Sequence, residues 1–338
     1  MFSGDGRQGS SMPEDRPFDG QWSDCCGRRV MAFLAAPGYL AELIRELGDS
    51  VLGCHGRLVF AEARATPPAW ALNIWQAPRL LTVASISDAA RQLRAIQRNW
   101  VACPVHLHRR TALVTEQLPS VAAGPLEFPC SLPGVPLGSW TLLSKDSILA
   151  SAECSSPFPN GVIRFSEDHV NPPSRAYLKL WEALTRIRRR PGPGDRCLDL
   201  GASPGGWTWV LHQLGADVIA VDKADLDPRL EGKERISRWK ESAFGLDPAA
   251  VGQVDWLFSD IVCYPRRLLD LMNRFLAAGT VRNFVCTVKF QGRTDFDVMS
   301  RFLEVPGSSL MHLVHNRHEL TWVVLDNDEK QEQRDAAH

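Results

Sequence analysis

The sequence predicts an α/β protein whose carboxyl-terminal half folds as a doubly wound, Rossmann-like sheet, preceded by a smaller α+β domain. From Cys197 onward, apolar segments of strand length alternate with helical segments, which is typical of a parallel sheet covered by helices. Before that point, short strand-like segments are separated by turns rich in proline and glycine. With 338 residues, the chain is long enough for about two domains.

The amino-terminal half begins with residues 1–25, whose content of Gly, Ser, Asp and Pro predicts a disordered tail. Residues 26–165 are expected to form the small α+β domain. Helices are expected at 37–47 and 87–100, and strands at 30–35, within 56–63, at 105–108, at 111–117 and within 140–151.

The carboxyl-terminal domain is expected at residues 166–326 and includes a proline-rich connector, Asn171-Pro172-Pro173. A helix should run from Ser174 to the basic segment that ends at Arg190. Strands are expected at 197–200, 218–221, 256–259, 284–288, 311–315 and 320–325. The last two are so close in sequence that they should form an antiparallel hairpin at the sheet edge. Residues 327–338 read as a charged tail.

The composition is that of an ordinary globular protein, with a formal net charge of -1, 44% hydrophobic residues and 23% charged residues. It excludes a collagen, a coiled coil and a largely disordered chain. No apolar run approaches the roughly 20 residues of a membrane span, and the polar amino terminus does not resemble a signal peptide. The nine cysteines are scattered without a Cys-x-x-Cys pair. We therefore expect a cytoplasmic, monomeric protein without a membrane partner or a metal site.

A glycine-rich turn follows the first strand of the second half and reads Asp-Leu-Gly-Ala-Ser-Pro-Gly-Gly-Trp (199–207). Glycines at this place allow a tight turn and a close approach of the backbone to a ligand. The spacing is not that of a dinucleotide-binding fingerprint, and Pro204 removes an N–H that a pyrophosphate would need. Asp222, at the end of the next strand, suits the two ribose hydroxyls of an adenosine ligand. A tight strand–helix turn with a capping acid is the alternative explanation.

Four charged residues stand at positions where such a sheet binds ligands: Lys179, Asp260, Lys289 and Glu319. Asp260 and Lys289 end apolar strands, whose carboxyl ends gather at the ligand-binding edge of an open parallel sheet. The chain has only seven lysines among its 38 basic residues, and lysine, unlike arginine, can become neutral. Each residue alone is more often a solvated charge, but four together in this order favour a catalytic site.

These residues resemble the Lys-Asp-Lys-Glu tetrad of the FtsJ-like RNA ribose 2'-O-methyltransferases. The segment "DLGASPGGWTWVL" is similar to that family's S-adenosylmethionine loop, and "AVDKADLDP" to its ribose-binding strand end. The segments "SSPFPNGVIRF", "PPSRAYLKLWEA" and "FSDIVCYP" resemble the subgroup that modifies a cytidine of bacterial 23S ribosomal RNA. The resemblance extends over about residues 155–326. In that subgroup the amino-terminal part is a ferredoxin-like and THUMP RNA-binding region, which the short strands here would fit.

The resemblance implies that the cofactor is S-adenosylmethionine and that the reaction methylates a ribose 2'-hydroxyl of RNA. Lys289 would be the general base, and the cation of Lys179 together with partial burial would favour its neutral form. Asp260 would orient Lys289, and Glu319 would position Lys179 or the target ribose. The residues implied to bind the cofactor are Ala176, Gly201, Ser203, Pro204, Gly205, Gly206, Trp207, Asp222, Ser242 and Asp260. Ser242 stands where the subgroup has an acid, and Ala176 would use only its backbone.

An arginine segment, Arg186, Arg188, Arg189 and Arg190, is either a patch for RNA phosphates or a solvated helix end. A different substrate, such as transfer RNA, also remains open. An inactive methyltransferase fold that only binds RNA is disfavoured, because simple binding would tolerate arginine at positions 179 and 289. Base methylation is disfavoured because Asn171-Pro172-Pro173 lacks the aromatic residue that would stack on a flipped base.

Overall fold

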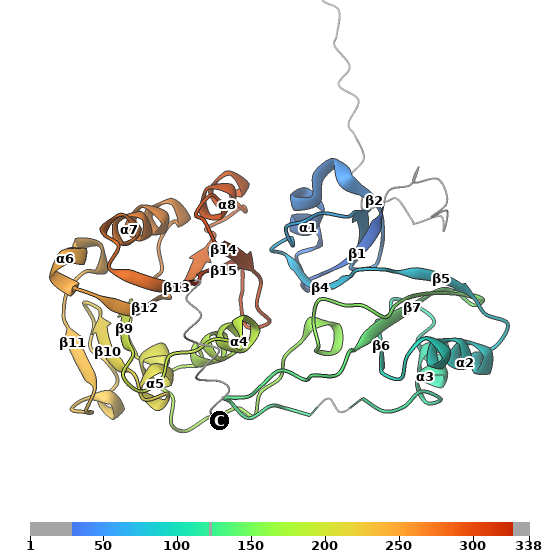
Figure 1. Cartoon of the computed structure of the whole chain (residues 1–338), viewed down its shortest axis with the longest axis horizontal. Coiled ribbons are helices and arrows are strands. Elements are labelled where there is room, and N and C mark those ends of the chain that lie inside the picture. Colours follow the sequence, from blue (N-terminus) through green and yellow to red (C-terminus); the bar gives the residue numbers. More distant parts are fainter. Residues whose placement is uncertain (1–28, 122–123, 327–338) are drawn as a thin grey trace, which may run out of the picture. The chain divides into compact units, whose positions relative to one another are not determined.

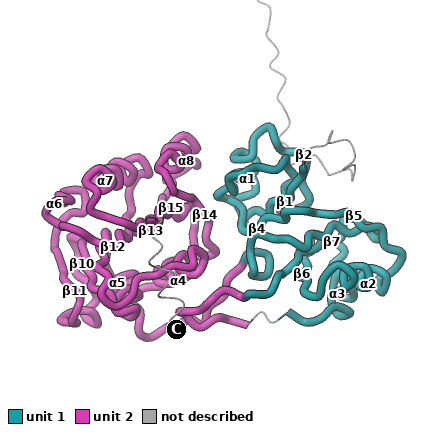
Figure 2. The backbone as a smooth tube through the Cα atoms, in the orientation of Figure 1, with its two compact units in different colours: residues 1–123, 134–161 teal, residues 124–133, 162–338 magenta. Residues whose placement is uncertain are grey.

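The computed structural model describes residues 29–121 and 124–326 and divides the chain into two compact units. Unit 1 contains residues 1–123 and 134–161, and unit 2 contains residues 124–133 and 162–338 (Figure 2). The tails expected at 1–25 and 327–338 lie outside the described residues. Within the described ranges, no helix is long and apolar enough to cross a membrane.

Unit 1 contains an antiparallel sheet in the order β2-β3-β1-β4, with α1 (Leu40–Leu47) as its helix. Its strands are β1 (Val30–Ala35), β2 (Val51–His55), β3 (Leu58–Glu62) and β4 (Ala71–Trp75). One face of this sheet, with Phe60 and Trp75, packs against Leu149 of the second sheet of the unit. The two sheets therefore share a hydrophobic core.

The second sheet of unit 1 has the order β5-β8-β7-β6 and is accompanied by two helices. The elements are β5 (Arg79–Thr82), α2 (Ile86–Ile96), β6 (Trp100–Ala102), α3 (His108–Thr115), β7 (Gly138–Ser144) and β8 (Ser147–Ser151). The prediction of strands at 105–108 and 111–117 is wrong, because α3 occupies most of residues 105–117. Thr111 and Val114, three residues apart, share the buried face of α3, and Val114 joins the core that α2 also lines.

Unit 2 is built on a mixed sheet with the order β11-β10-β9-β12-β13-β15-β14. Its strands are β9 (Arg196–Leu200), β10 (Asp217–Val221), β11 (Ile236–Trp239), β12 (Val254–Ser259), β13 (Val281–Lys289), β14 (Ser308–Met311) and β15 (Glu319–Val324). The first five are parallel, whereas β15 runs antiparallel to β13 and β14. The predicted α/β class and the antiparallel pair of strands at the sheet edge are confirmed, but the strand expected at 311–315 is wrong, because β14 ends at Met311 and residues 312–318 connect it to β15.

Helices lie on both faces of this sheet, with α4 and α5 on one side and α6, α7 and α8 on the other (Figure 1). They are α4 (Tyr177–Ile187), α5 (Gly206–Gln213), α6 (Pro248–Val251), α7 (Pro265–Ala278) and α8 (Phe296–Leu303). α7 begins with a proline at its first turn and is followed by Gly279 in the left-handed region, which are common start and stop signals. Buried strands and amphipathic helices thus meet in one core.

The order of the strands creates a switch point between β9 and β12. After β9 the chain adds β10 and β11 on one side of it, and then crosses to place β12 on the other side. Open α/β sheets bind ligands at such a point, beyond the carboxyl ends of the strands. The turns that follow β9 and β12 touch here, since a Cβ atom on Gly201 would lie 2.5 Å from Cγ1 of Ile261.

The core of unit 2 allows a first prediction, at Phe258. This side chain on β12 is 0% exposed and packs against the rings of Trp207 and Trp256. Phe258→Ala should lower the free energy of unfolding by about 3–5 kcal/mol, because it removes a buried ring and leaves a cavity. Val170→Ala, at a side chain that is 76% exposed, should change it by less than about 0.5 kcal/mol. Urea denaturation of both variants checks this, and similar losses in the two would contradict the packing described here.

Candidate active site

The four charged residues singled out in the sequence meet at the carboxyl ends of the central strands. Lys179 lies in the first turn of α4, and Asp260 follows the last residue of β12. Lys289 ends β13 and Glu319 begins β15. Because β13 and β15 pair antiparallel, Lys289 and Glu319 stand directly opposite each other in the register. The fold thus brings together residues that are up to 140 positions apart in the chain.

Their side chains form one connected cluster. Lys179 Nζ lies 3.1 Å from Oδ1 of Asp260 and 2.8 Å from Oε1 of Glu319. Lys289 Nζ lies 2.9 Å from Oδ1 of Asp260 and donates a 2.5 Å hydrogen bond to the backbone oxygen of the same residue. The four side chains are between 10% and 18% exposed. The cluster is therefore partly shielded but still reachable from solvent.

The two lysines differ in their surroundings. Lys179 contacts two carboxylates, whereas Lys289 contacts only that of Asp260 among the described residues. Burial by itself lowers the pKa of Lys179, but the charges and hydrogen bonds of Asp260 and Glu319 outweigh it, so that its pKa is raised. Lys179 consequently remains a cation near neutral pH.

The glycine-rich turn occupies the switch point beside this cluster. Gly201 and Gly205 have φ angles of +78° and +117°, in the region that favours glycine. At Gly206 a Cβ atom would lie 2.5 Å from Oγ of Ser174, so the turn also packs closely against the segment before α4. These glycines are required by the path of the chain itself. The turn brings backbone near the place where a ligand would lie, with Ser203 and the exposed Pro204 at its tip.

Asp222 connects this turn to the end of β10. Its Oδ2 accepts a hydrogen bond of 3.1 Å from the backbone N–H of Ser203, and its Oδ1 one of 2.9 Å from that of Ala224. A carboxylate has about four acceptor positions, so both oxygens can still accept hydrogen bonds from vicinal hydroxyls. The position and the acceptor chemistry of Asp222 therefore fit the ribose of an adenosine cofactor between the ends of β9 and β10.

Three further residues that the sequence predicts to bind the cofactor are Trp207, Ala176 and Ser242, and they differ in their hydrogen bonds. Trp207 is buried, and its indole N–H donates a 2.9 Å hydrogen bond to the backbone oxygen of Ala176. This bond links α5 to the start of α4, near Lys179. Ser242 is partly exposed at the start of a short 3-10 helix, and its hydroxyl caps no backbone N–H there.

The arginine segment lies apart from the tetrad. Arg186 pairs with the buried Glu182 at 2.7 Å, and Arg189 donates to the backbone oxygen of Asp326, just beyond β15. β15 has six residues and begins at Glu319, so its far end is about 20 Å from the tetrad. Arg188 and Arg190 are exposed. Two of the four arginines therefore make contacts within the fold.

Asp199 is a further charged group near the site that the sequence prediction did not include. It lies within β9, is 1% exposed and accepts a 2.6 Å hydrogen bond from the hydroxyl of Thr208. Burial is the main cause that raises its pKa to about 7, and the charges of Asp260 and Asp222 act in the same direction. The sequence did contain a signal for this residue, because Asp199 is an acidic residue inside the otherwise apolar strand segment Cys-Leu-Asp-Leu.

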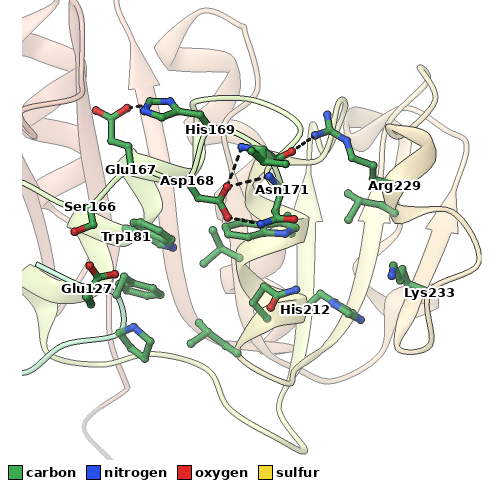
Figure 3. Close-up of a pocket in the computed structure, with 18 residues that line it drawn as sticks. Glu127, Ser166, Glu167, Asp168, His169, Asn171, Trp181, His212, Arg229 and Lys233 are labelled. Atoms are coloured by element: carbon green, nitrogen blue, oxygen red, sulfur yellow. Dashed lines mark hydrogen bonds and ion pairs between the residues drawn. The ribbon is translucent and has the colours of Figure 1, made fainter.

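A separate cavity of about 1410 Å³ opens elsewhere on unit 2 (Figure 3). Its aromatic lining consists of Phe128, Trp181 and Trp209. None of its lining residues belongs to the tetrad or to the glycine-rich turn. We therefore place the candidate chemistry at the shallow, charged cluster and not in this larger cavity.

The fold and the site define the class of this domain. Residues 172–303 match the family model of the FtsJ-like methyltransferases. The match covers the glycine-rich turn and three members of the charged cluster, whereas Glu319 lies beyond its end. The family resemblance inferred from the sequence is confirmed for this segment.

Three relatives of this chain are named ribosomal RNA large subunit methyltransferase M. The chain is 34% identical over 172 residues to that of Halorhodospira halophila, covering 48% of this chain and 50% of the relative. It is 35% identical over 186 residues to that of Alkalilimnicola ehrlichii, covering 51% of each. A longer match, 29% identical over 273 residues, covers 73% of this chain and 71% of the relative from Marinobacter nauticus. In the first two matches the aligned part spans about half of the relative's length.

The titration of Asp199 allows a second prediction. Its carboxyl has a pKa of about 7 in the folded protein and about 4 when unfolded, so between these values only the folded chain holds the proton. The stability contributed by this group must therefore fall as the pH rises from about 4 to about 7. Asp199→Asn keeps the size and removes the titration. The free energy of unfolding of the wild type, minus that of the variant, should be lower at pH 8 than at pH 5.

Urea denaturation followed by tryptophan fluorescence at both pH values measures this difference. Asp227→Asn is the control, because the hydrogen bonds from Arg229 hold the pKa of Asp227 at about 2, outside the tested range. Its difference from the wild type should stay constant between pH 5 and pH 8. A constant difference for Asp199→Asn as well would show that Asp199 does not titrate in this interval.

Proposed function

We propose that this protein transfers a methyl group from S-adenosylmethionine to a ribose 2'-hydroxyl of RNA, with a cytidine of 23S ribosomal RNA as the target. The observation that carries the proposal is the cluster of Lys179, Asp260, Lys289 and Glu319, joined by contacts of 2.8–3.1 Å beside the glycine-rich turn. The FtsJ-like match and the names of the relatives support both the chemistry and the large-subunit substrate.

The residues at the switch point fit the cofactor. Asp222 would accept hydrogen bonds from its ribose hydroxyls, the turn at 201–206 would pass along it, and Asp260 would lie near its reactive end. When bound, S-adenosylmethionine supplies a methyl group on a positively charged sulfur. The backbone and carboxylates around it are held by the contacts described above, so that little needs to move.

This chain has to accept the proton that leaves the target hydroxyl. Lys289 would take the 2'-hydroxyl proton at Nζ, which would make that oxygen a nucleophile for the methyl group that the cofactor would supply. The contacts with Oδ1 and the backbone oxygen of Asp260 orient that nitrogen. Lys179 stays protonated between Asp260 and Glu319, and its charge stabilises the developing alkoxide. The two lysines thus have different roles because they contact different numbers of carboxylates.

Unit 1 supplies a surface suited to an RNA backbone. Residues 79–115 include six arginines and a single acidic residue, although the whole chain is close to neutral. Arg91 and Arg94 on α2, and Arg109 on α3, are exposed. Phosphate contacts by such arginines position a nucleic acid without reading its sequence. We assign the holding of the substrate RNA to this unit and the chemistry to unit 2.

The general base is tested by Lys289→Arg. The substitution keeps the positive charge, but a guanidinium does not lose its proton near neutral pH. Turnover should fall by roughly 10²–10⁴-fold, the usual contribution of general acid–base catalysis, while the affinity for S-adenosylmethionine stays the same. The assay is methyl transfer to large-subunit ribosomal RNA from cells without the gene. Lys240→Arg, at an exposed lysine of the same unit, should keep wild-type turnover. A Lys289→Arg enzyme of near wild-type rate would show that the lysine only contributes charge.

The cofactor site is tested by Asp222→Ala and Asp222→Asn. Loss of the charged acceptor should weaken the binding of S-adenosylmethionine by about 1.5–3 kcal/mol in the alanine variant, and by less in the asparagine variant, which keeps one oxygen. Isothermal titration calorimetry measures both. Asp225→Ala, at an exposed acid three residues later that pairs with Lys240, serves as the control. Unchanged affinity in Asp222→Ala would remove this residue from the cofactor site.

A further inference from the structure

A second carboxylate on α4, that of Glu182, stands out by its complete burial. It is 0% exposed, although glutamate is almost never fully buried without a partner. It lies three residues after Lys179, so the two side chains project from neighbouring positions on one side of the helix. Glu182 therefore shares its helix face with a member of the charged cluster.

The backbone N–H groups that the Glu182 carboxylate accepts all belong to a single turn of the chain. Its Oε1 and Oε2 accept the backbone N–H of Val314 at 3.0 and 2.9 Å, and Oε2 also accepts that of His315 at 3.4 Å. Arg186, one helical turn further on, lies 2.7 Å from Oε1 and neutralises the charge. A buried carboxylate with backbone donors and a counter-ion is a strong and specific attachment.

The turn that Glu182 holds leads directly to Glu319. Residues 312–318 connect β14 to β15, and Glu319 is the first residue of β15. Within the turn, Asn316 donates a 3.2 Å hydrogen bond to the backbone oxygen of Glu319, and Arg317 N–H donates one of 3.4 Å to its Oε1. The position of Glu319 therefore depends on that of the turn, which α4 holds through Glu182.

We propose that Glu182, with Arg186 as its counter-ion, is a positioning residue of the candidate active site. It fixes the turn at 312–318 on α4, and this places Glu319 where it contacts Lys179 at 2.8 Å. Glu319 in turn helps to keep Lys179 protonated. The inference rests on the proposed function, and it reassigns Arg186 from RNA phosphates to the support of this turn.

A double-mutant cycle on the full-length protein tests the route through Glu319. The readout is methyl transfer from labelled S-adenosylmethionine to large-subunit ribosomal RNA from cells without the gene. Glu182→Gln alone should lower kcat about ten- to a hundredfold, with KM for RNA within about twofold of the wild type. In a Glu319→Gln background the same change should lower kcat by less than about twofold, because the residue it acts through is already altered. Equal losses in both backgrounds would overturn the proposal.

The matched control is Glu46→Gln. Glu46, on α1 of unit 1, is a partly buried carboxylate that likewise accepts two backbone N–H groups, those of Ala69 at 2.7 Å and Trp70 at 3.1 Å. This variant should lower the melting temperature and leave kcat within about twofold of the wild type. If it lowered kcat as much as Glu182→Gln, the effect of Glu182 would be one of general stability and the proposal would fail.

Arg186 gives an independent test if Glu182→Gln does not fold. Arg186→Gln should lower kcat at unchanged KM for RNA, and Arg186→Lys, which keeps the charge, should recover most of the loss. A raised KM for RNA with normal kcat would return Arg186 to an RNA-binding role and overturn the inference.

Amide hydrogen exchange separates this inference from the proposed function. Exchange in residues 312–319 should become faster in Glu182→Gln, and unchanged exchange would show that Glu182 does not hold the turn. Wild-type protein that methylates no large-subunit RNA would overturn the proposed function, while the exchange measurement would still decide the structural claim.

Discussion

The carboxylate of Asp260 is the group on which the candidate active site depends. It lies within 3.1 Å of Lys179 and 2.9 Å of Lys289, so it holds the amino groups of the two lysines in one cluster. One of them comes from a helix that precedes the sheet and the other from the neighbouring strand. Because β12 ends at the switch point, the same residue lies beside the glycine-rich turn. The proposed cofactor site and the proposed base are therefore organised around a single side chain.

Ion pairs with little exposure to solvent occur at two places along α4. Lys179 pairs with Asp260 and Glu319 at the start of the helix, and Glu182 pairs with Arg186 further along. Buried ion pairs contribute little net stability, since desolvation offsets much of their attraction. Their presence is better explained by the need to hold side chains in fixed positions. The helix acts as a common support for the acid that ends β12 and the acid that begins β15.

The disagreements between sequence and structure have identifiable causes. At 111–117 the β-branched residues favoured a strand, but Thr111 and Val114 meet the core at helical spacing beside α2. The sequence leaves the arginine segment open between a phosphate-binding patch and a solvated helix end, and in the structure Arg186 and Arg189 are engaged by Glu182 and by the backbone of Asp326. For α3 and for Arg189 the partner is distant in sequence, and local composition carries no information about such a partner.

The sequence by itself determined the α/β class, five of the seven strands of the central sheet (β9, β10, β12, β13 and β15) and the identity of the four clustered residues. It could do so because apolar periodicity and the position of a residue at a strand end are local properties of the chain. Only the tertiary structure decided that Lys179 contacts two carboxylates and Lys289 one, that Asp199 lies buried beside the site, and that Glu182 holds the turn before Glu319. These features depend on distances and burial between segments far apart in the chain, which arise only when the sheet and its helices have packed.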